Sequence, residues 1–161
     1  MSTNFSRRHF VGTSAAALTA AILIRPSIAK AAAFPVTHSD ADWHRILDPK
    51  RYAVLRQAAT EAPFSSPLLN EHRRGTFVCA GCAQPLFSSA TKFESGTGWP
   101  SFWRPLAGAD RLRPDHSDGM DRTEVLCARC GGHLGHVFDD GPKPTGQRYC
   151  MNGLAMQFRP A

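Results

Sequence analysis

Residues 127–138 have the sequence CARCGGHLGHVF, and residues 79–82 have the related sequence CAGC. Each Cys-x-x-Cys pair fits a tight turn that points both sulfurs at one ion, and glycines lie in or beside both turns. Four thiolates form the tetrahedral set that zinc prefers in closed structural sites. The sequence therefore predicts one structural Zn²⁺, which would join two distant parts of a single domain. Its ligands would be Cys79, Cys82, Cys127 and Cys130.

Other uses of these four cysteines stay open on the sequence alone. In an exported protein they could form two disulfides, and a Cys-x-x-Cys pair can also exchange thiols with disulfides. His133 and His136 follow Cys130 closely enough to be alternative metal ligands. Four thiolates already complete a tetrahedral shell, however, so zinc held by the cysteines alone is the favoured interpretation.

The fifth cysteine, Cys150, lies in a segment that is typical of a β-strand. Alternate side chains of a strand share a face, so Arg148, Cys150 and Asn152 would project together. Tyr149 and Met151 would then pack on the opposite face. A guanidinium beside a thiol favours the nucleophilic thiolate, and the Asn152 amide can position a substrate. The alternative is a buried cysteine with a purely structural role.

Histidines and aromatic residues offer further candidates for a site. His133 and His136 are three residues apart and Asp140 follows them. A histidine can donate or accept a proton near neutral pH, and a nearby carboxylate can fix its tautomer. Trp99 and Phe102 lie in a glycine-rich loop that could clasp a small apolar group. The competing interpretation places the histidines in an ordinary polar loop and the aromatic rings in the core.

The remaining pattern predicts a mainly antiparallel β domain after one or two short helices. Residues 43–60 are typical of a helix that restarts at Pro49, since proline is tolerated in a first helical turn. Its expected buried positions are Ile46, Tyr52, Val54 and Leu55. Short segments broken by glycine and proline follow. The expected strands are 76–79, 123–127, 136–138, 148–152 and 155–158.

The N-terminal residues 1–33 have the layout of an export signal. Arg7 and Arg8 precede an apolar stretch at 11–24, and small residues follow at 29–33. Paired arginines before an aromatic residue resemble the twin-arginine signal, which implies the twin-arginine translocase as a partner. An amphipathic helix or an uncleaved anchoring helix is the alternative. We expect a signal peptide over 1–33, a domain over 34–161, and a periplasmic or otherwise exported protein that meets the membrane only during export.

The net charge does not favour a nucleic-acid partner. The formal charge is +6, but the first 33 residues contain four basic and no acidic residues, which leaves +2 on the rest. No run of lysine and arginine with interleaved aromatics is present. A zinc protein that binds nucleic acid is thus disfavoured. A zinc-stabilised module without catalysis and a thiol–disulfide exchanger remain as rival classes.

The order of the motifs is more specific than any one of them. It resembles the type-B methionine sulfoxide reductases from about Trp43 to about Phe158. This resemblance implies two antiparallel β-sheets in a tent-like arrangement, with zinc on the two knuckles. It also implies reduction of the R epimer of methionine sulfoxide in proteins and peptides. The motifs are CAGC at 79–82, GTGWPSF at 96–102, RTEV at 122–125, CARC at 127–130, HLGHVF at 133–138, PTG at 144–146 and RYC at 148–150.

The resemblance also assigns roles to residues. It implies that Cys150 is the nucleophile, and that Trp99 holds the substrate methyl group. Phe102, in the same loop, is expected to help in binding the substrate. The remaining substrate and acid-catalysis residues would be His133, His136, Asp140, Arg148 and Asn152. One of the two histidines, through a water or Asp140, would protonate the sulfoxide oxygen while Cys150 becomes a sulfenic acid.

The chain departs from many relatives at two places. Thr97 stands where they have a second, resolving cysteine. The resemblance therefore implies a one-cysteine mechanism in which an external thiol, from a thioredoxin-like protein or another reductant, restores Cys150. Met151 and Gly153 stand where relatives commonly have isoleucine and serine. We expect small changes in the pocket from these two residues, with the same reaction.

Overall fold

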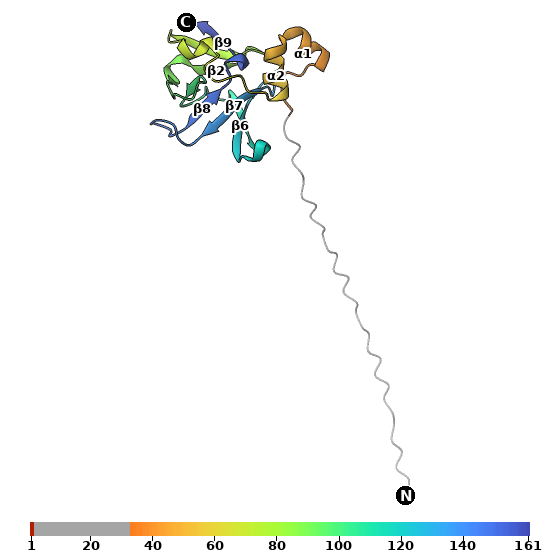
Figure 1. Ribbon diagram of the computed structural model, residues 1–161. Coiled ribbons are helices and arrows are strands. Elements are labelled where there is room, and N and C mark those ends of the chain that lie inside the picture. The colour runs from red at the N-terminus through yellow and green to blue at the C-terminus, as the bar shows by residue number, and fades with distance from the viewer. Residues whose placement is uncertain (2–32) are drawn as a thin grey trace. The chain divides into compact units, whose positions relative to one another are not determined.

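The structure is a computed structural model that describes Met1 and residues 33–161 (Figure 1). The predicted signal peptide over 1–33 therefore lies almost entirely outside the described residues. Between residues 33 and 161, no helix is both long enough and apolar enough to cross a membrane.

Two short helices precede the strands, as the sequence predicts. Helix α1 spans Asp40–Ile46 and helix α2 spans Pro49–Gln57. The Asp48 side chain caps α2 by accepting hydrogen bonds from two backbone amides, and Pro49 occupies the first turn, where its missing N–H costs nothing. The predicted restart of the helix at Pro49 is confirmed.

The buried face of these helices differs from the prediction at one position. Tyr52, Val54 and Leu55 are buried as expected, but Ile46 is 50% exposed. Trp43 and Leu47 are buried in its place. Helix α1 ends at Ile46 and the backbone of Leu47 is extended, so it is Leu47 and not Ile46 that reaches the core.

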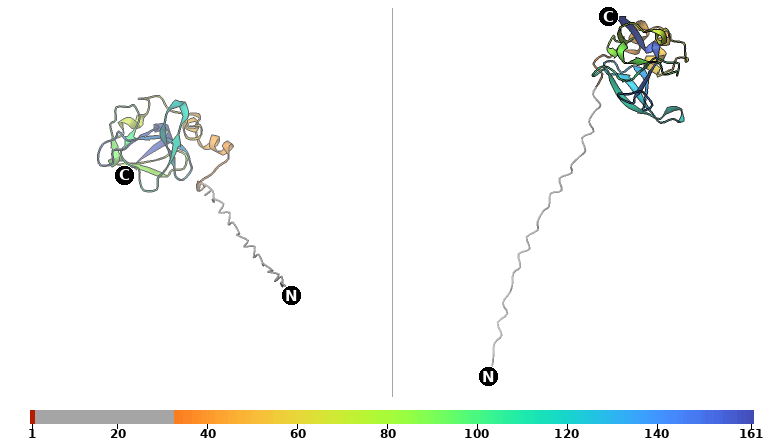
Figure 2. Two further views of the ribbon diagram at one scale, coloured as in Figure 1. Left: turned by 90° about the horizontal axis from the view of Figure 1, so that it is seen from below. Right: turned by 90° about the vertical axis from the view of Figure 1, so that its left-hand side faces the viewer.

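The strands form two antiparallel sheets, which confirms the predicted fold class. One sheet has the order β2-β1-β9 and the other the order β3-β4-β8-β7-β6-β5. Strands β2 and β9 lie above β6, β7 and β8 in Figure 1, and the left view of Figure 2 shows the two helices at one side of the strands. The bounds are β1 Gly75–Cys79, β2 Pro85–Ser88, β3 Lys92–Phe93, β4 Ser101–Phe102, β5 Asp110–Asp115, β6 Arg122–Cys127, β7 His133–Phe138, β8 Arg148–Met151 and β9 Met156–Pro160.

Four strands were not predicted, namely β2, β3, β4 and β5. Strand β5 lies at the edge of its sheet, contains Pro114 and has mostly exposed or half-exposed side chains. It therefore lacks the apolar alternation by which a half-buried strand is recognised. Strands β3 and β4 have only two residues each, and pairing with their neighbours defines them.

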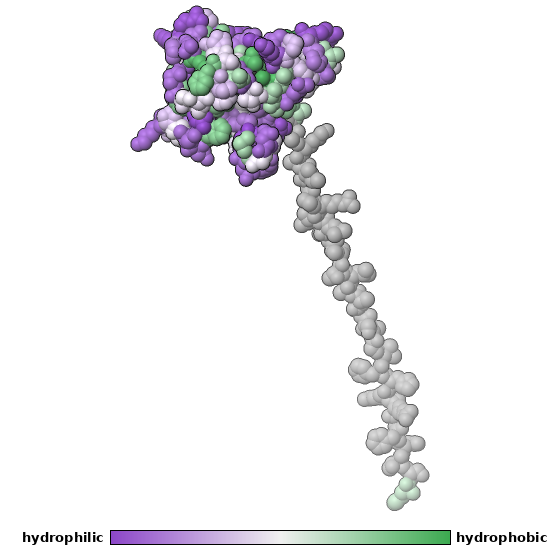
Figure 3. Space-filling view, viewed as in Figure 1, coloured by the Kyte–Doolittle hydropathy of each residue, from purple (hydrophilic) through white to green (hydrophobic). Residues whose placement is uncertain are grey.

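Aromatic rings join the two sheets in the core. Phe77 of β1 and Phe87 of β2 both contact Phe102 of β4, with ring centroids 4.9 and 4.3 Å apart. All three side chains are fully buried. The visible surface is by contrast mostly hydrophilic, with apolar residues in small separate patches (Figure 3). These buried aromatic contacts hold the two sheets against each other.

Candidate active site

The four knuckle cysteines converge on one point, as predicted. Their sulfur atoms all lie within 4.8 Å of one another. The Sγ atoms of Cys79 and Cys130 are 3.7 Å apart, and those of Cys82 and Cys127 are 3.6 Å apart. Tetrahedral zinc with Zn–S bonds of about 2.3 Å requires sulfur separations of about 3.8 Å. The cysteines are not joined in disulfides, and their arrangement fits one zinc ion.

This cluster connects the two sheets. Cys79 is the last residue of β1, and Cys127 is the last residue of β6 in the other sheet. Each knuckle turn is closed by a backbone hydrogen bond, from Ala83 N to Cys79 O and from Gly131 N to Cys127 O. A metal bound here would therefore fix the sheets to each other at one end.

A separate pocket of about 190 Å³ contains the predicted nucleophile. Cys150 of β8 and His136 of β7 are direct partners in the antiparallel register, so both side chains emerge on the same face of the sheet. Tyr149 and Met151 are buried on the other face, which confirms the predicted alternation. The lining residues are Thr60, Trp99, Arg122, Gly135, His136, Phe138, Cys150 and Asn152.

Two opposing effects act on the Cys150 thiol. Burial raises its pKa, while hydrogen bonds from Thr97 and the nearby Arg148 guanidinium act to lower it. Thr97 Oγ1 lies 3.7 Å from Cys150 Sγ. Burial is the largest effect, and the net pKa is raised. The sequence argument that arginine favours the thiolate was therefore incomplete, because the sequence did not show that the sulfur is partly buried.

His136 is oriented by a carboxylate that the sequence did not indicate. Its Nε2 lies 2.8 Å from Asp115 Oδ2. The same oxygen accepts a hydrogen bond of 2.8 Å from Arg122. Hydrogen bonds from Ser117 and from His136 hold the pKa of the Asp115 carboxyl well below its usual range. An ionised Asp115 thus fixes the ring of His136 inside the pocket.

The expected partnership of Asp140 with a histidine is wrong. Asp140 accepts two hydrogen bonds of 2.8 Å from Arg148, one from Nε and one from a terminal nitrogen. This bidentate pair holds the guanidinium near Cys150, and it lowers the pKa of Asp140. Asp140 therefore acts on Arg148. The carboxylate that does contact His136 is Asp115, which lies 21 residues earlier in the chain. Asp115 belongs to the exposed edge strand β5, whose sequence does not predict this contact.

His133 lies behind the pocket and does not line it. It is 4% exposed, its Nδ1 is 2.7 Å from Glu124 Oε1, and its ring centroid is 5.4 Å from that of His136. Burial lowers the pKa of His133 and outweighs the opposite effect of Glu124. Arg113 holds the second oxygen of Glu124. The two histidines thus have different positions. His136 lines the pocket, whereas His133 is buried and packs against the ring of His136.

Asn152 and Trp99 are tied to the backbone of Glu61. Asn152 Oδ1 accepts from Glu61 N at 3.0 Å, and Trp99 Nε1 donates to Glu61 O at 3.1 Å. The buried Glu61 carboxylate in turn accepts from the backbone amides of Gly153 and Leu154. Burial raises the pKa of Glu61. The sequence gave no indication that this residue orders the segment after the nucleophile.

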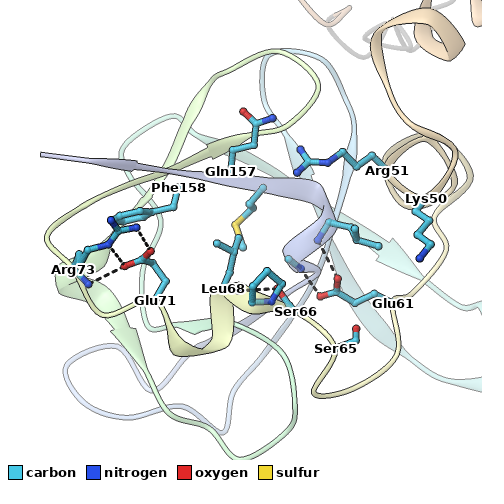
Figure 4. Close-up of a pocket in the computed structure, with 14 residues that line it drawn as sticks. Lys50, Arg51, Glu61, Ser65, Ser66, Leu68, Glu71, Arg73, Gln157 and Phe158 are labelled. Carbon is cyan, nitrogen blue, oxygen red and sulfur yellow. Dashed lines mark hydrogen bonds and ion pairs between the residues drawn. The ribbon is translucent and has the colours of Figure 1, made fainter.

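Figure 4 shows the surroundings of the Glu61 side chain. There its side chain lines a separate groove of about 490 Å³ together with Arg51, Leu68 and Phe158. The Glu61 side chain is thus not part of the lining of the Cys150 pocket, although its backbone holds two residues of that pocket.

The predicted substrate contact of Phe102 is also corrected. Its ring is fully buried between Phe77 and Phe87 and does not line the pocket. Phe138, which closes the motif HLGHVF, lines the pocket instead. In a glycine-rich loop, the sequence could not distinguish the aromatic ring that faces the pocket, Trp99, from the one that fills the core.

Comparison with known proteins shows the family of this chain. The SelR domain family matches residues 47–160. A "Peptide methionine sulfoxide reductase MsrB" of Leptospira interrogans is 52% identical over 127 residues, which cover 78% of this chain and 97% of that protein. The proteins of the same name from Agrobacterium fabrum and Bradyrhizobium diazoefficiens are 53% and 57% identical, over 93% and 91% of their lengths. The chain therefore belongs to the SelR-domain family that includes the MsrB peptide methionine sulfoxide reductases.

Proposed function

We propose that this protein reduces the R epimer of methionine sulfoxide in oxidised proteins and peptides, with Cys150 as nucleophile. The observation that carries the proposal is the pairing of Cys150 with His136 in a small pocket between Trp99 and Phe138. A nucleophile, a proton donor and apolar walls are thus combined in one place. These are the parts that reduction of a methyl sulfoxide requires.

The proposed chemistry has two stages. The Cys150 thiolate attacks the sulfoxide sulfur and forms a sulfur–sulfur bond, while His136 gives a proton to the sulfoxide oxygen. The hydroxyl then passes from the methionine sulfur to the Cys150 sulfur as the sulfur–sulfur bond breaks, so methionine leaves and Cys150 becomes a sulfenic acid. Two external thiols then supply two electrons, so that Cys150 returns to the thiol and a disulfide and water are formed.

The choice of epimer follows from fixed positions around the substrate sulfur. Trp99 and Phe138 would hold the methyl group, while His136 would face the oxygen. The peptide chain must leave through the mouth of the pocket. A chiral sulfur can satisfy all three positions in only one configuration, which is why each epimer needs its own enzyme.

An external reductant follows from the use of the other cysteines. The chain has five cysteines, and we assign four of them to a structural Zn²⁺ because their sulfurs have the separations that zinc requires. The residue beside the Cys150 sulfur in the loop before β4 is Thr97, which cannot act as a resolving thiol. We therefore propose that a thioredoxin-like protein or another thiol compound recycles the enzyme.

We also propose that residues 1–33 direct export through the twin-arginine translocase to the periplasm or beyond the cell. The paired arginines, the apolar stretch and the small residues after it support this proposal. Cell fractionation of the natural chain, compared with one in which Arg7 and Arg8 are both replaced by lysine, tests it. Equal export of both proteins would contradict it.

The reductase proposal is tested with separated epimers of a blocked methionine sulfoxide and dithiothreitol as reductant. We expect turnover of the R epimer and at least about a hundredfold less of the S epimer. This ratio reflects the loss of the required hydrogen bonds by the wrong epimer in a buried polar site. Turnover of neither epimer by folded protein that contains one zinc ion would overturn the proposal.

Asp115 gives a further prediction, because it contacts His136 and lies outside the pocket lining. Replacing Asp115 with asparagine should lower kcat by roughly tenfold to a hundredfold, as is typical when the partner of a functional histidine is lost. The change in KM should be small, since no substrate contact is removed. Steady-state kinetics separates the two quantities.

Asp118→Asn is the matched control for this variant. Asp118 also contacts Arg122, at 3.3 Å, but its side chain is largely exposed and does not contact His136. Its kcat should stay within about twofold of the natural enzyme, because exposed ion pairs contribute little. Equal kinetic effects of the two variants would show that Asp115 acts through Arg122 alone.

A further inference from the structure

Three hydroxyl groups form a continuous line that ends at the proposed nucleophile. Ser101 Oγ lies 2.7 Å from Ser95 Oγ, and Ser95 Oγ lies 2.8 Å from Thr97 Oγ1. Thr97 Oγ1 lies 3.7 Å from Cys150 Sγ, within hydrogen-bond range for a sulfur atom. At the far end, Ser101 Oγ is 3.1 Å from the carbonyl oxygen of Trp99.

This line is built into the fold. Ser101 lies in β4 and is the direct register partner of Cys150 in β8. Its side chain is 1% exposed, so water does not compete for its hydroxyl. Ser95 and Thr97 are partly buried in the loop between β3 and β4. The hydroxyls therefore have few partners other than one another.

Counting protons leaves two consistent arrangements, because each hydroxyl donates only one. When Cys150 is a thiol, it can donate to Thr97, which donates to Ser95, then to Ser101, and finally to the Trp99 carbonyl. When Cys150 is a thiolate, every bond can reverse, so that the chain donates toward the sulfur. The Trp99 carbonyl then loses this donor.

We propose that Ser101, Ser95 and Thr97 act as a hydroxyl relay that stabilises the Cys150 thiolate by reversing its hydrogen bonds when the sulfur loses its proton. A hydrogen bond to a charged acceptor is stronger than one between neutral groups. Each donor is also strengthened by the donor behind it. Thr97 contacts the reacting sulfur, whereas Ser95 and Ser101 are positioning residues that act through Thr97. The inference rests on the proposed role of Cys150 as nucleophile.

The relay approaches the sulfur from the loop between β3 and β4, whose charged residue, Glu94, is exposed and pairs with Lys92. The Arg148 guanidinium acts on the same thiol from its own strand, and Asp140 opposes that effect. His136 faces Cys150 from β7, with Asp115 and Arg122 behind it. Burial raises the pKa of the thiol, and the Thr97 hydrogen bond is the largest effect that lowers it. The neutral relay is thus a separate source of stabilisation beside the charged groups.

The test measures the pH dependence of alkylation of Cys150 by iodoacetamide in the full, zinc-containing chain, with the modified peptide identified by mass spectrometry. Only the thiolate reacts, so the midpoint reports its formation without any sulfoxide substrate. Thr97→Val should raise the midpoint by about one pH unit, since a hydrogen bond to a charged group is lost. Ser95→Ala and Ser101→Ala should each raise it by about 0.3 to 0.5 units, through lost polarisation.

Two conservative variants serve as controls. Thr97→Ser keeps the donor, and Ser88→Ala removes a hydroxyl that caps a turn elsewhere; both should keep the natural midpoint. A raised midpoint in Thr97→Val alone would overturn the relay, because Thr97 would then act without the serines. Unchanged midpoints in all variants would overturn it also.

Failure of the relay and failure of the proposed reductase are distinguishable. If the protein is inactive but the alkylation midpoints shift as expected, the relay is supported and the proposed reaction is contradicted. If the variants are active but their midpoints do not shift, the reaction is supported and the relay is overturned. Ser95→Ala and Ser101→Ala interrupt the line at different bonds, so either one is sufficient if the other does not fold. Zinc content and circular dichroism establish folding.

Discussion

Replacing Cys150 with serine is expected to abolish sulfoxide reduction and to leave the fold intact. A serine hydroxyl is far less nucleophilic than a thiolate and cannot form the sulfenic acid intermediate. Loss of an enzyme's nucleophile typically costs several orders of magnitude, so kcat should fall by at least about a thousandfold. The R epimer with dithiothreitol is the substrate pair for the measurement.

The structure supplies an internal control for this variant. Cys150 is only partly buried and exchanges one atom in the substitution, so the free energy of unfolding should change by less than about 1 kcal/mol. In the native zinc-containing protein, one thiol should react with a thiol reagent at a pH high enough to form the thiolate, and none should in the variant. Residual turnover above about 1% would assign the nucleophile to another residue, given the thousandfold loss expected.

Removal of zinc is expected to have a large effect on the stability of the fold, whereas the Cys150 substitution affects the reaction. The four cysteines join the end of β1 to the end of β6 and thereby hold the two sheets together. The apparent free energy with which structural zinc binds zinc-finger peptides is about 10 to 16 kcal/mol at neutral pH. Domains are stable by only about 5 to 15 kcal/mol in total. The metal-free chain should therefore lose its cooperative thermal transition.

The comparison of two cysteine variants isolates the metal from the amino-acid change. Cys127→Ser removes a ligand, and Cys150→Ser removes a cysteine outside the cluster. Metal analysis and thermal unfolding should show loss of zinc and of the folded state in the first variant only. A metal-free protein that unfolds with the same midpoint as the zinc-containing one would show that the apolar core alone holds the sheets.

The sequence by itself determined the features that depend on neighbouring residues. The spacing of each Cys-x-x-Cys pair set its knuckle turn, and the alternation along residues 148–152 placed Cys150 opposite Tyr149 and Met151. Pro49 marked the start of the second helix. In each case a local conformation decides the outcome, because a turn, a strand or a helix fixes the directions of side chains within a few residues.

The tertiary structure alone decided which distant groups meet. Asp115 reaches His136 across a sheet, and Glu61 reaches Asn152 from 91 positions away. Phe102 turned inward although Trp99, in the same loop, faces the pocket. No local pattern contains these contacts, because they depend on strand register and on the packing of one sheet against the other. The balance of forces on the Cys150 thiol depends on the same packing, since burial and the Thr97 contact arise only in the folded chain.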